Sequence, residues 1–153
     1  MNTPEKNLER LGIVLPEPLA PVANFVPYVR SGNLLFVSGQ VSAGPEGRIN
    51  GRLGETMELD DGYAAARACG INLIAQCRSA VGELSRIKQV VKLGGFVNAA
   101  PDFIDIPKVI NGCSDLMVDV FADAGRHARF AVGAVSLPGG VAVEVDGVFE
   151  LAG

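Results

Sequence analysis

The sequence predicts one α+β domain, built from a mixed β-sheet with two helices packed on one face. Strand-like and helix-like segments follow one another in the order β-β-α-β-α-β-β. The chain has 153 residues, the size of one domain, and 48% of them are hydrophobic. Because two helices cover only one face of a sheet, the other face needs another subunit, and we expect an oligomer.

The first segment, residues 1–21, predicts a short helix and a proline-rich connector within the same domain. Thr3 is a typical N-cap, Pro4 occupies the first helical position, and Gly12 ends the helix after Leu11. Three prolines then favour an extended chain: Pro16, Pro18 and Pro21. This connector is not predicted to separate two domains.

A hairpin follows, with strands over residues 26–30 and 33–41 around the turn pair Ser31-Gly32. Four consecutive apolar residues, 34–37, predict that the second strand is central and covered on both faces. Residues 44–47 have the composition of a surface turn.

Two segments carry apolar side chains at spacings of three and four, which indicates helices with one buried stripe. They are residues 59–84 and 109–121, the second with Gly125 as its stop. Residues 87–100, between them, have the composition of a strand.

The end of the chain predicts a second hairpin. Residues 141–151 alternate between apolar and other side chains, so Glu144 faces away from the core-facing Val143 and Val145. Residues 129–137 are the expected partner strand, joined through the turn at 138–140. In this antiparallel pair Arg129 and Glu144 lie side by side.

Composition excludes several classes of function. A net charge of −4 does not favour nucleic-acid binding. The single histidine, His127, rules out a two-imidazole metal site, and the three cysteines lack metal or disulfide spacing, so we expect no metal and reduced thiols. Neither a secretory signal nor a membrane helix is indicated, and we expect a soluble cytoplasmic protein.

Four motifs together resemble the RidA family, also called YjgF or L-PSP, over roughly residues 22–151. They are Pro27-Tyr28-Val29, Val37-Ser38-Gly39-Gln40-Val41, His127-Ala128-Arg129 with the later Leu137-Pro138, and Val143-Glu144-Val145. The segments Val109 to Leu116 and Gly125-Arg126-His127 are similar to a longer branch of that family, labelled "putative endoribonuclease".

This resemblance implies a chorismate-mutase-like fold and a homotrimer with active sites in the clefts between subunits. It also implies a cofactor-free deaminase that hydrolyses 2-imino or enamine acids to 2-keto acids and ammonia. Arg129 would bind the substrate carboxylate, which a guanidinium grips at two points. Glu144 would orient water and move a proton. The remaining substrate contacts would come from Tyr28, Gly39 and Asn111.

Other interpretations of the same residues remain open. The protein could bind a small 2-keto or 2-imino acid for regulation without turnover, or it could be the endoribonuclease of the branch label. Arg129 alone is typical of a surface ion pair, Glu144 of a solvated sheet residue, and Tyr28 of packing. His127 could act as a base for Cys113, although a cysteine on an apolar stripe is usually inert. His127 and Phe130 depart from the short family members, and Phe130 beside the guanidinium is expected to narrow the cleft.

Overall fold

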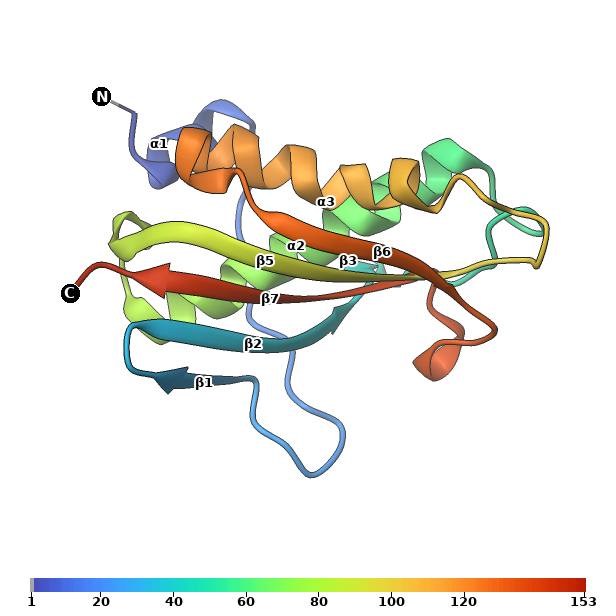
Figure 1. Cartoon of the computed structure of the whole chain (residues 1–153), viewed down its shortest axis with the longest axis horizontal. Helices are drawn as coiled ribbons and strands as arrows, with labels where there is room; N and C mark the ends of the chain where they lie inside the picture. The colour runs from blue at the N-terminus through green and yellow to red at the C-terminus, as the bar shows by residue number, and fades with distance from the viewer. Residues whose placement is uncertain (1) are drawn as a thin grey trace.

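The computed structural model describes residues 2–153 and is organised by a five-stranded sheet of order β1-β2-β7-β5-β6 (Figure 1). Strands β5 and β6 are parallel, and the other neighbouring pairs are antiparallel. The predicted mixed sheet is thus present. The five strands are β1 (Tyr28–Ser31), β2 (Leu34–Val41), β5 (Ile87–Asn98), β6 (Ala128–Ala134) and β7 (Val143–Leu151).

The last two strands are not neighbours, so the predicted hairpin of residues 129–151 is wrong. β7 pairs with β2 on one side and β5 on the other, while β6 pairs only with β5. The helix between β5 and β6 returns the chain to the same end of the sheet, which makes these two strands parallel. Because β7 gains two partners in the middle of the sheet, β6 is left at the edge.

Two long helices, α2 (Leu59–Val81) and α3 (Ile106–Phe121), cover one face of the sheet, as predicted (Figure 1). Glycines allow the helices to approach closely. A Cβ at Gly112 would overlap the backbone of Tyr63, and one at Gly70 would press on Leu116 and Cys113. This close contact holds α3 in a fixed position over the sheet.

A third helix, α1 (Pro4–Arg10), packs against the outside of α3, and the Thr3 side chain caps it as predicted. Asn7 Nδ2 donates to the carbonyl oxygen of Val120 at 2.8 Å, and Glu5 Oε2 accepts from the backbone N–H of Leu84 at 2.7 Å. The N-terminal segment is therefore attached at two buried or half-buried points. The short elements are β3 (Ala43–Gly44), β4 (Gly47–Arg48), η1 (Leu84–Arg86), η2 (Ala122–Gly125) and η3 (Pro138–Gly140).

The second face of the sheet is open in the single chain and carries large apolar side chains. Phe36, for example, is 44% exposed, so the prediction that β2 is covered on both faces is wrong for one chain. Burial of exposed apolar area is the main driving force for association between subunits. The exposed side chains are Val29, Phe36, Phe96, Phe130 and Val132.

The core lies between the sheet and the two long helices, and all three cysteines are in it. Burial raises the pKa of each thiol, that of Cys113 to about 12. These thiols are core side chains rather than nucleophiles. Within residues 2–153, no helix has the length and apolarity needed to span a bilayer.

Candidate functional site

Arg129 lies on edge strand β6, and its side chain is directed at α3. Nη1 donates to Ser114 Oγ at 3.0 Å and Nη2 to the carbonyl oxygen of Pro107 at 3.2 Å. Ser114 Oγ also lies 2.8 Å from Nε2 of His127, just ahead of the strand. We call Ser114, His127 and Arg129 the arginine cluster. All three side chains are half-buried.

The partners of His127 determine its tautomer. Nδ1 lies 2.6 Å from the carbonyl oxygen of Gly125, which can only accept, so Nδ1 carries the proton. In the neutral ring Nε2 must then accept from the Ser114 hydroxyl. Burial, helped by the charge of Arg129, lowers the pKa of His127 below 6.5, so the ring is neutral at pH 7.

The guanidinium keeps donors for a ligand. Arginine has five N–H groups, and those of Arg129 have two protein acceptors, which leaves three without a partner among residues 2–153. Within the same range no carboxylate forms an ion pair with it. Asn111 lies about one helical turn before Ser114 on α3. The arginine cluster thus contains a fixed, unneutralised cation.

Glu144 belongs to a different part of the molecule, at the start of β7. Its half-buried carboxylate lies over Gly39 in β2, where a Cβ would overlap Glu144 Oε2. Gly39 falls at an irregularity in the pairing of β2 with β7, between Val37 and Gln40. The glycine at residue 39 therefore leaves space for the carboxylate, which a larger residue would displace.

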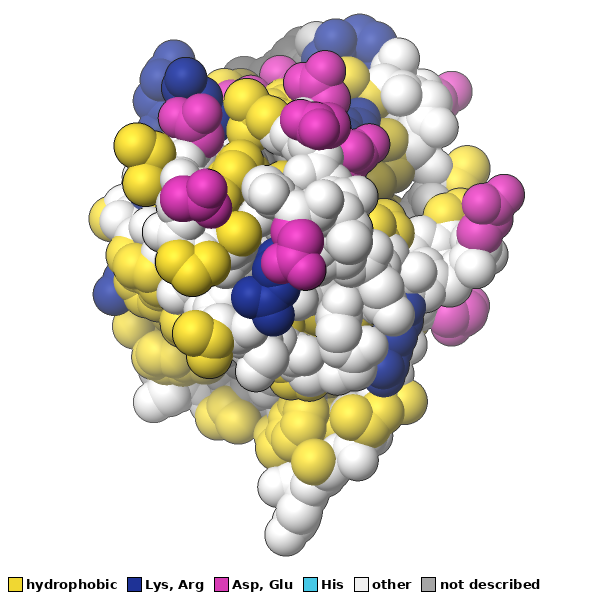
Figure 2. All heavy atoms as spheres, turned by 90° about the vertical axis from the view of Figure 1, so that its right-hand side faces the viewer, with side chains coloured by type: hydrophobic (Ala, Val, Ile, Leu, Met, Phe, Trp, Pro, Cys, Tyr) yellow, Lys and Arg dark blue, Asp and Glu magenta, His cyan; other side chains and the backbone are white. Residues whose placement is uncertain are grey.

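A cavity of about 540 Å³, which we call the glutamate cavity, opens beside this carboxylate. The proline-rich connector forms one wall and β2, the β3–β4 hairpin and η3 the others. The connector projects at the lower end of Figure 2, where hydrophobic side chains gather. The lining residues are Leu19, Ala20, Pro21, Val22, Ala23, Phe25, Pro27, Gly39, Gln40, Val41, Ala43, Gly44, Gly47, Arg48, Pro138 and Glu144.

Burial, with a smaller contribution from the neighbouring charge of Asp146, raises the pKa of Glu144 above its usual 4.5. A carboxylate with a raised pKa accepts a proton more readily, which suits a general base. Of the predicted site residues, Glu144 and Gly39 thus lie together in the single chain.

The arginine cluster and the glutamate cavity lie apart in one chain. Arg129 faces the helices, whereas Glu144 faces the open side of the sheet, and β5 separates their strands. The expectation that the two side chains lie side by side is wrong, because it assumed that β6 and β7 are paired. Arg129 does not line the glutamate cavity.

Two further interpretations of the sequence are corrected by the structure. Phe130 is not beside the guanidinium of Arg129, because successive strand residues face opposite sides of the sheet. Its ring packs edge-on against that of Phe96, with the ring centroids 5.4 Å apart. The partner of His127 is Ser114, not Cys113. The Tyr28 hydroxyl lies 3.4 Å from Ser79 Oγ on α2, and Tyr28 does not line the glutamate cavity of the single chain, so its contact with substrate stays a prediction.

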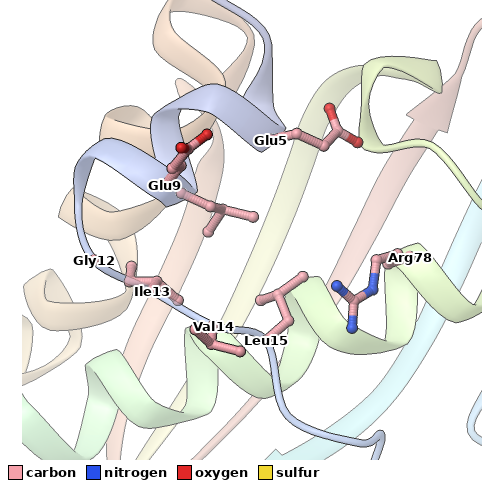
Figure 3. Close-up of a pocket in the computed structure, with 8 residues that line it drawn as sticks. Glu5, Glu9, Gly12, Ile13, Val14, Leu15 and Arg78 are labelled. Carbon is pink, nitrogen blue, oxygen red and sulfur yellow. The ribbon is translucent and has the colours of Figure 1, made fainter.

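A second cavity, of about 390 Å³, lies between α1 and α2 (Figure 3). It is lined by Glu5 and Glu9 of α1, Arg78 of α2, and the apolar side chains of Ile13 and Leu15 (Figure 3). None of the predicted site residues lines it. Among residues 2–153, no group of three His, Cys, Asp or Glu side chains is placed to hold a metal ion.

Comparison with known proteins gives one consistent family. Residues 5–145 match the family described as "YjgF/chorismate mutase-like, putative endoribonuclease". Protein TCP17 of Trypanosoma cruzi is 50% identical over 147 residues, which cover 95% of this chain and 92% of that protein. A crystal structure titled putative endoribonuclease, from Shewanella oneidensis, is 39% identical with a TM-score of 0.95, covering 98% of this chain and 100% of that one.

A structure named RidA is a more distant relative. RidA from an Antarctic Psychrobacter bacterium is 28% identical with a TM-score of 0.59, and the match covers 88% of this chain and 94% of that one. The Shewanella oneidensis structure thus superposes more closely on this chain than the Psychrobacter RidA structure does. The resemblance inferred from the four motifs is confirmed.

Proposed function

Because the chain belongs to the YjgF/chorismate mutase-like, putative endoribonuclease family, we propose that it is a cofactor-free deaminase of small 2-imino or enamine acids. The products would be a 2-keto acid and ammonia. The observation that carries the proposal is Arg129, a half-buried guanidinium with free donors and no carboxylate partner among residues 2–153. A site of this kind favours a carboxylate ligand.

Besides the guanidinium of Arg129, the reaction needs a water molecule and a general base. With the substrate carboxylate on Arg129, a water molecule must add to the imine carbon, and a base must take its proton. Glu144 suits this role because its pKa is raised. The resulting carbinolamine loses ammonia after its nitrogen is protonated, so that one water is consumed and one ammonia released.

Glu144 cannot meet Arg129 within one chain, so we propose that the active site forms between subunits of a homotrimer. The open sheet face with its exposed apolar side chains and the unpaired edge of β6 support such an assembly. In this arrangement the arginine cluster of one subunit, with Asn111, faces the glutamate cavity of the next. Light scattering tests the mass, and a monomer would contradict the assembly.

The activity is tested by generating an imino acid with an amino-acid oxidase and following its decay. We expect the protein to accelerate decay, and Arg129→Ala to lower kcat/KM by about 100-fold, since each charge-assisted hydrogen bond is worth about 1.5–3 kcal/mol. Arg126→Ala is the matched control, because Arg126 is an exposed arginine that pairs with Asp123.

The same variants separate the other interpretations. If 2-keto acids bind in an Arg129-dependent way but no imine decay is accelerated, the protein is a carboxylate-binding protein without turnover. If wild type and Arg129→Ala accelerate imine decay equally, Arg129 does not bind the substrate carboxylate. RNA cleavage that persists through stringent purification and is lost in Arg129→Ala would support the endoribonuclease label instead.

A further inference from the structure

Ser114 and His127 form a Ser–His pair that imine hydrolysis does not use. The Ser114 hydroxyl donates to Nε2 of His127 at 2.8 Å, and the carbonyl oxygen of Gly125 holds the ring from its other side, 2.6 Å from Nδ1. A hydroxyl next to an imidazole that a third group orients is the arrangement that activates serine nucleophiles. The ring is neutral at pH 7 and can therefore accept a proton.

Ser114 differs in this respect from the other serines whose contacts are known. The sequence has one histidine, so only one serine can be paired with an imidazole. Ser38 and Ser42 donate to the carbonyl oxygens of Val26 and Ile49, and Ser79 lies against the hydroxyl of Tyr28. Neither a carbonyl nor a neutral phenol takes up a proton near pH 7. Only the partner of Ser114 can act as a base.

Arg129 provides the third requirement, a fixed donor for negative charge. Nη1 lies 3.0 Å from Ser114 Oγ, so the guanidinium is adjacent to any atom that becomes bonded to that oxygen. Its remaining N–H groups can donate to an oxyanion that develops there. The base, the nucleophile and the cation all come from two neighbouring elements, α3 and the start of β6.

We propose that Ser114 is the nucleophile of an acyl-transfer centre, activated by His127, whose substrates are activated carboxylic esters. Oγ bonds to the ester carbonyl carbon, its proton passes to His127 Nε2, and the carbonyl oxygen becomes an oxyanion beside Arg129. The bond to the alcohol then breaks, and the alcohol leaves with the proton from His127. Water cleaves the serine ester by the same route, which releases the acid and restores Ser114.

The proposal is tested on the full chain with an alkyl fluorophosphonate, which replaces its fluoride with the oxygen of an activated serine. Intact mass is expected to show one adduct per chain, and peptide mapping is expected to place it on Ser114. Ser114→Ala should give no adduct, and His127→Gln should react at least about 100-fold more slowly. Ser79→Ala is the matched control and should react like wild type.

Several outcomes overturn the proposal. These are the absence of an adduct on the wild-type chain, an adduct mapped to another residue, and equal labelling rates for His127→Gln and wild type. Thermal melting checks that the variants fold. If Ser114→Ala does not fold, mapping of the wild-type adduct still shows whether Ser114 is the residue that reacts. Because the probe needs no imine, this test and the deaminase test can succeed or fail separately.

Discussion

The arginine cluster and the glutamate cavity differ in nearly every physical property. The cluster is held by four hydrogen bonds that fix the guanidinium and the imidazole. Arg129 nevertheless lines neither the glutamate cavity nor the cavity between α1 and α2. The cavity has volume, apolar walls and a carboxylate, and its cation, Arg48, is exposed at the rim. One region is preorganised for binding an anion, and the other is shaped to enclose a ligand and accept a proton. The difference indicates that the two regions are complementary halves.

Mixing two inactive chains is the strongest test of this complementarity. Arg129→Ala and Glu144→Gln are each expected to be nearly inactive as imine deaminases. In co-expressed mixed trimers at equal amounts, about a quarter of the clefts combine an intact arginine with an intact glutamate, so about a quarter of wild-type activity should return. Recovery is measured as imine decay per chain. If mixing restores nothing, the two residues do not act across subunits.

Adding one methyl group to the floor of the cavity should weaken only the glutamate half. Gly39→Ala places a Cβ against Glu144 Oε2, which displaces the carboxylate, and we expect kcat to fall about 10-fold. Gly44→Ala is the control, because Gly44 lines the same cavity with open space around its Cβ position. Equal rates for the two variants would show that the position of Glu144 is unimportant.

Removing the charge of Asp146, next to Glu144, should shift the pH profile of kcat/KM without changing its maximum. Asp146 raises the pKa of Glu144, so Asp146→Asn should lower it and move the acidic limb of kcat/KM to lower pH. The profile is measured by imine decay between pH 4 and 8. Glu150→Gln, on the same strand but paired with Lys88, should leave the limb unchanged. If the acidic limb moves equally in both variants, the ionisation of Glu144 does not control the pH dependence of kcat/KM.

The smallest expected effect is on stability. The pKa of Glu144 is higher in the folded than in the unfolded chain, so its contribution to stability declines as pH rises through the folded pKa. Glu144→Gln should therefore raise Tm slightly at pH 7, and the difference from wild type should vanish at acid pH, where both side chains are neutral. A lower Tm at pH 7 would mean that the carboxylate makes a stabilising contact.

The sequence was sufficient to predict the local elements but not the order of the strands. Helical spacing predicted α2 and α3, and the Thr3-Pro4 pair predicted the start of α1. Alternation predicted that Glu144 faces away from the core but not which strands flank it, because pairing between distant segments depends on the whole fold. β6 and β7 were therefore paired wrongly.

The arginine cluster shows the same limit at the level of single residues. The sequence signal was one histidine two residues before Arg129, and Cys113 was weighed as its partner and disfavoured, because a cysteine on an apolar stripe is usually inert. On a helix the next residue, Ser114, is turned by about 100°, and this rotation separates a core side chain from one that faces the strand. Only the placement of α3 against β6 decides between them. By contrast, strand alternation alone could have shown that Phe130 faces away from the guanidinium.

The presence of a single histidine has a practical consequence. His127 gives the protein one set of imidazole ring resonances, so the proton spectrum needs no assignment by mutagenesis. The ring is hydrogen-bonded to Ser114, which contacts the guanidinium of Arg129, so an anion placed there will change its chemical shift. The molecule therefore carries a built-in spectroscopic reporter, with which a library of small acids can be screened for binding before any reaction is known.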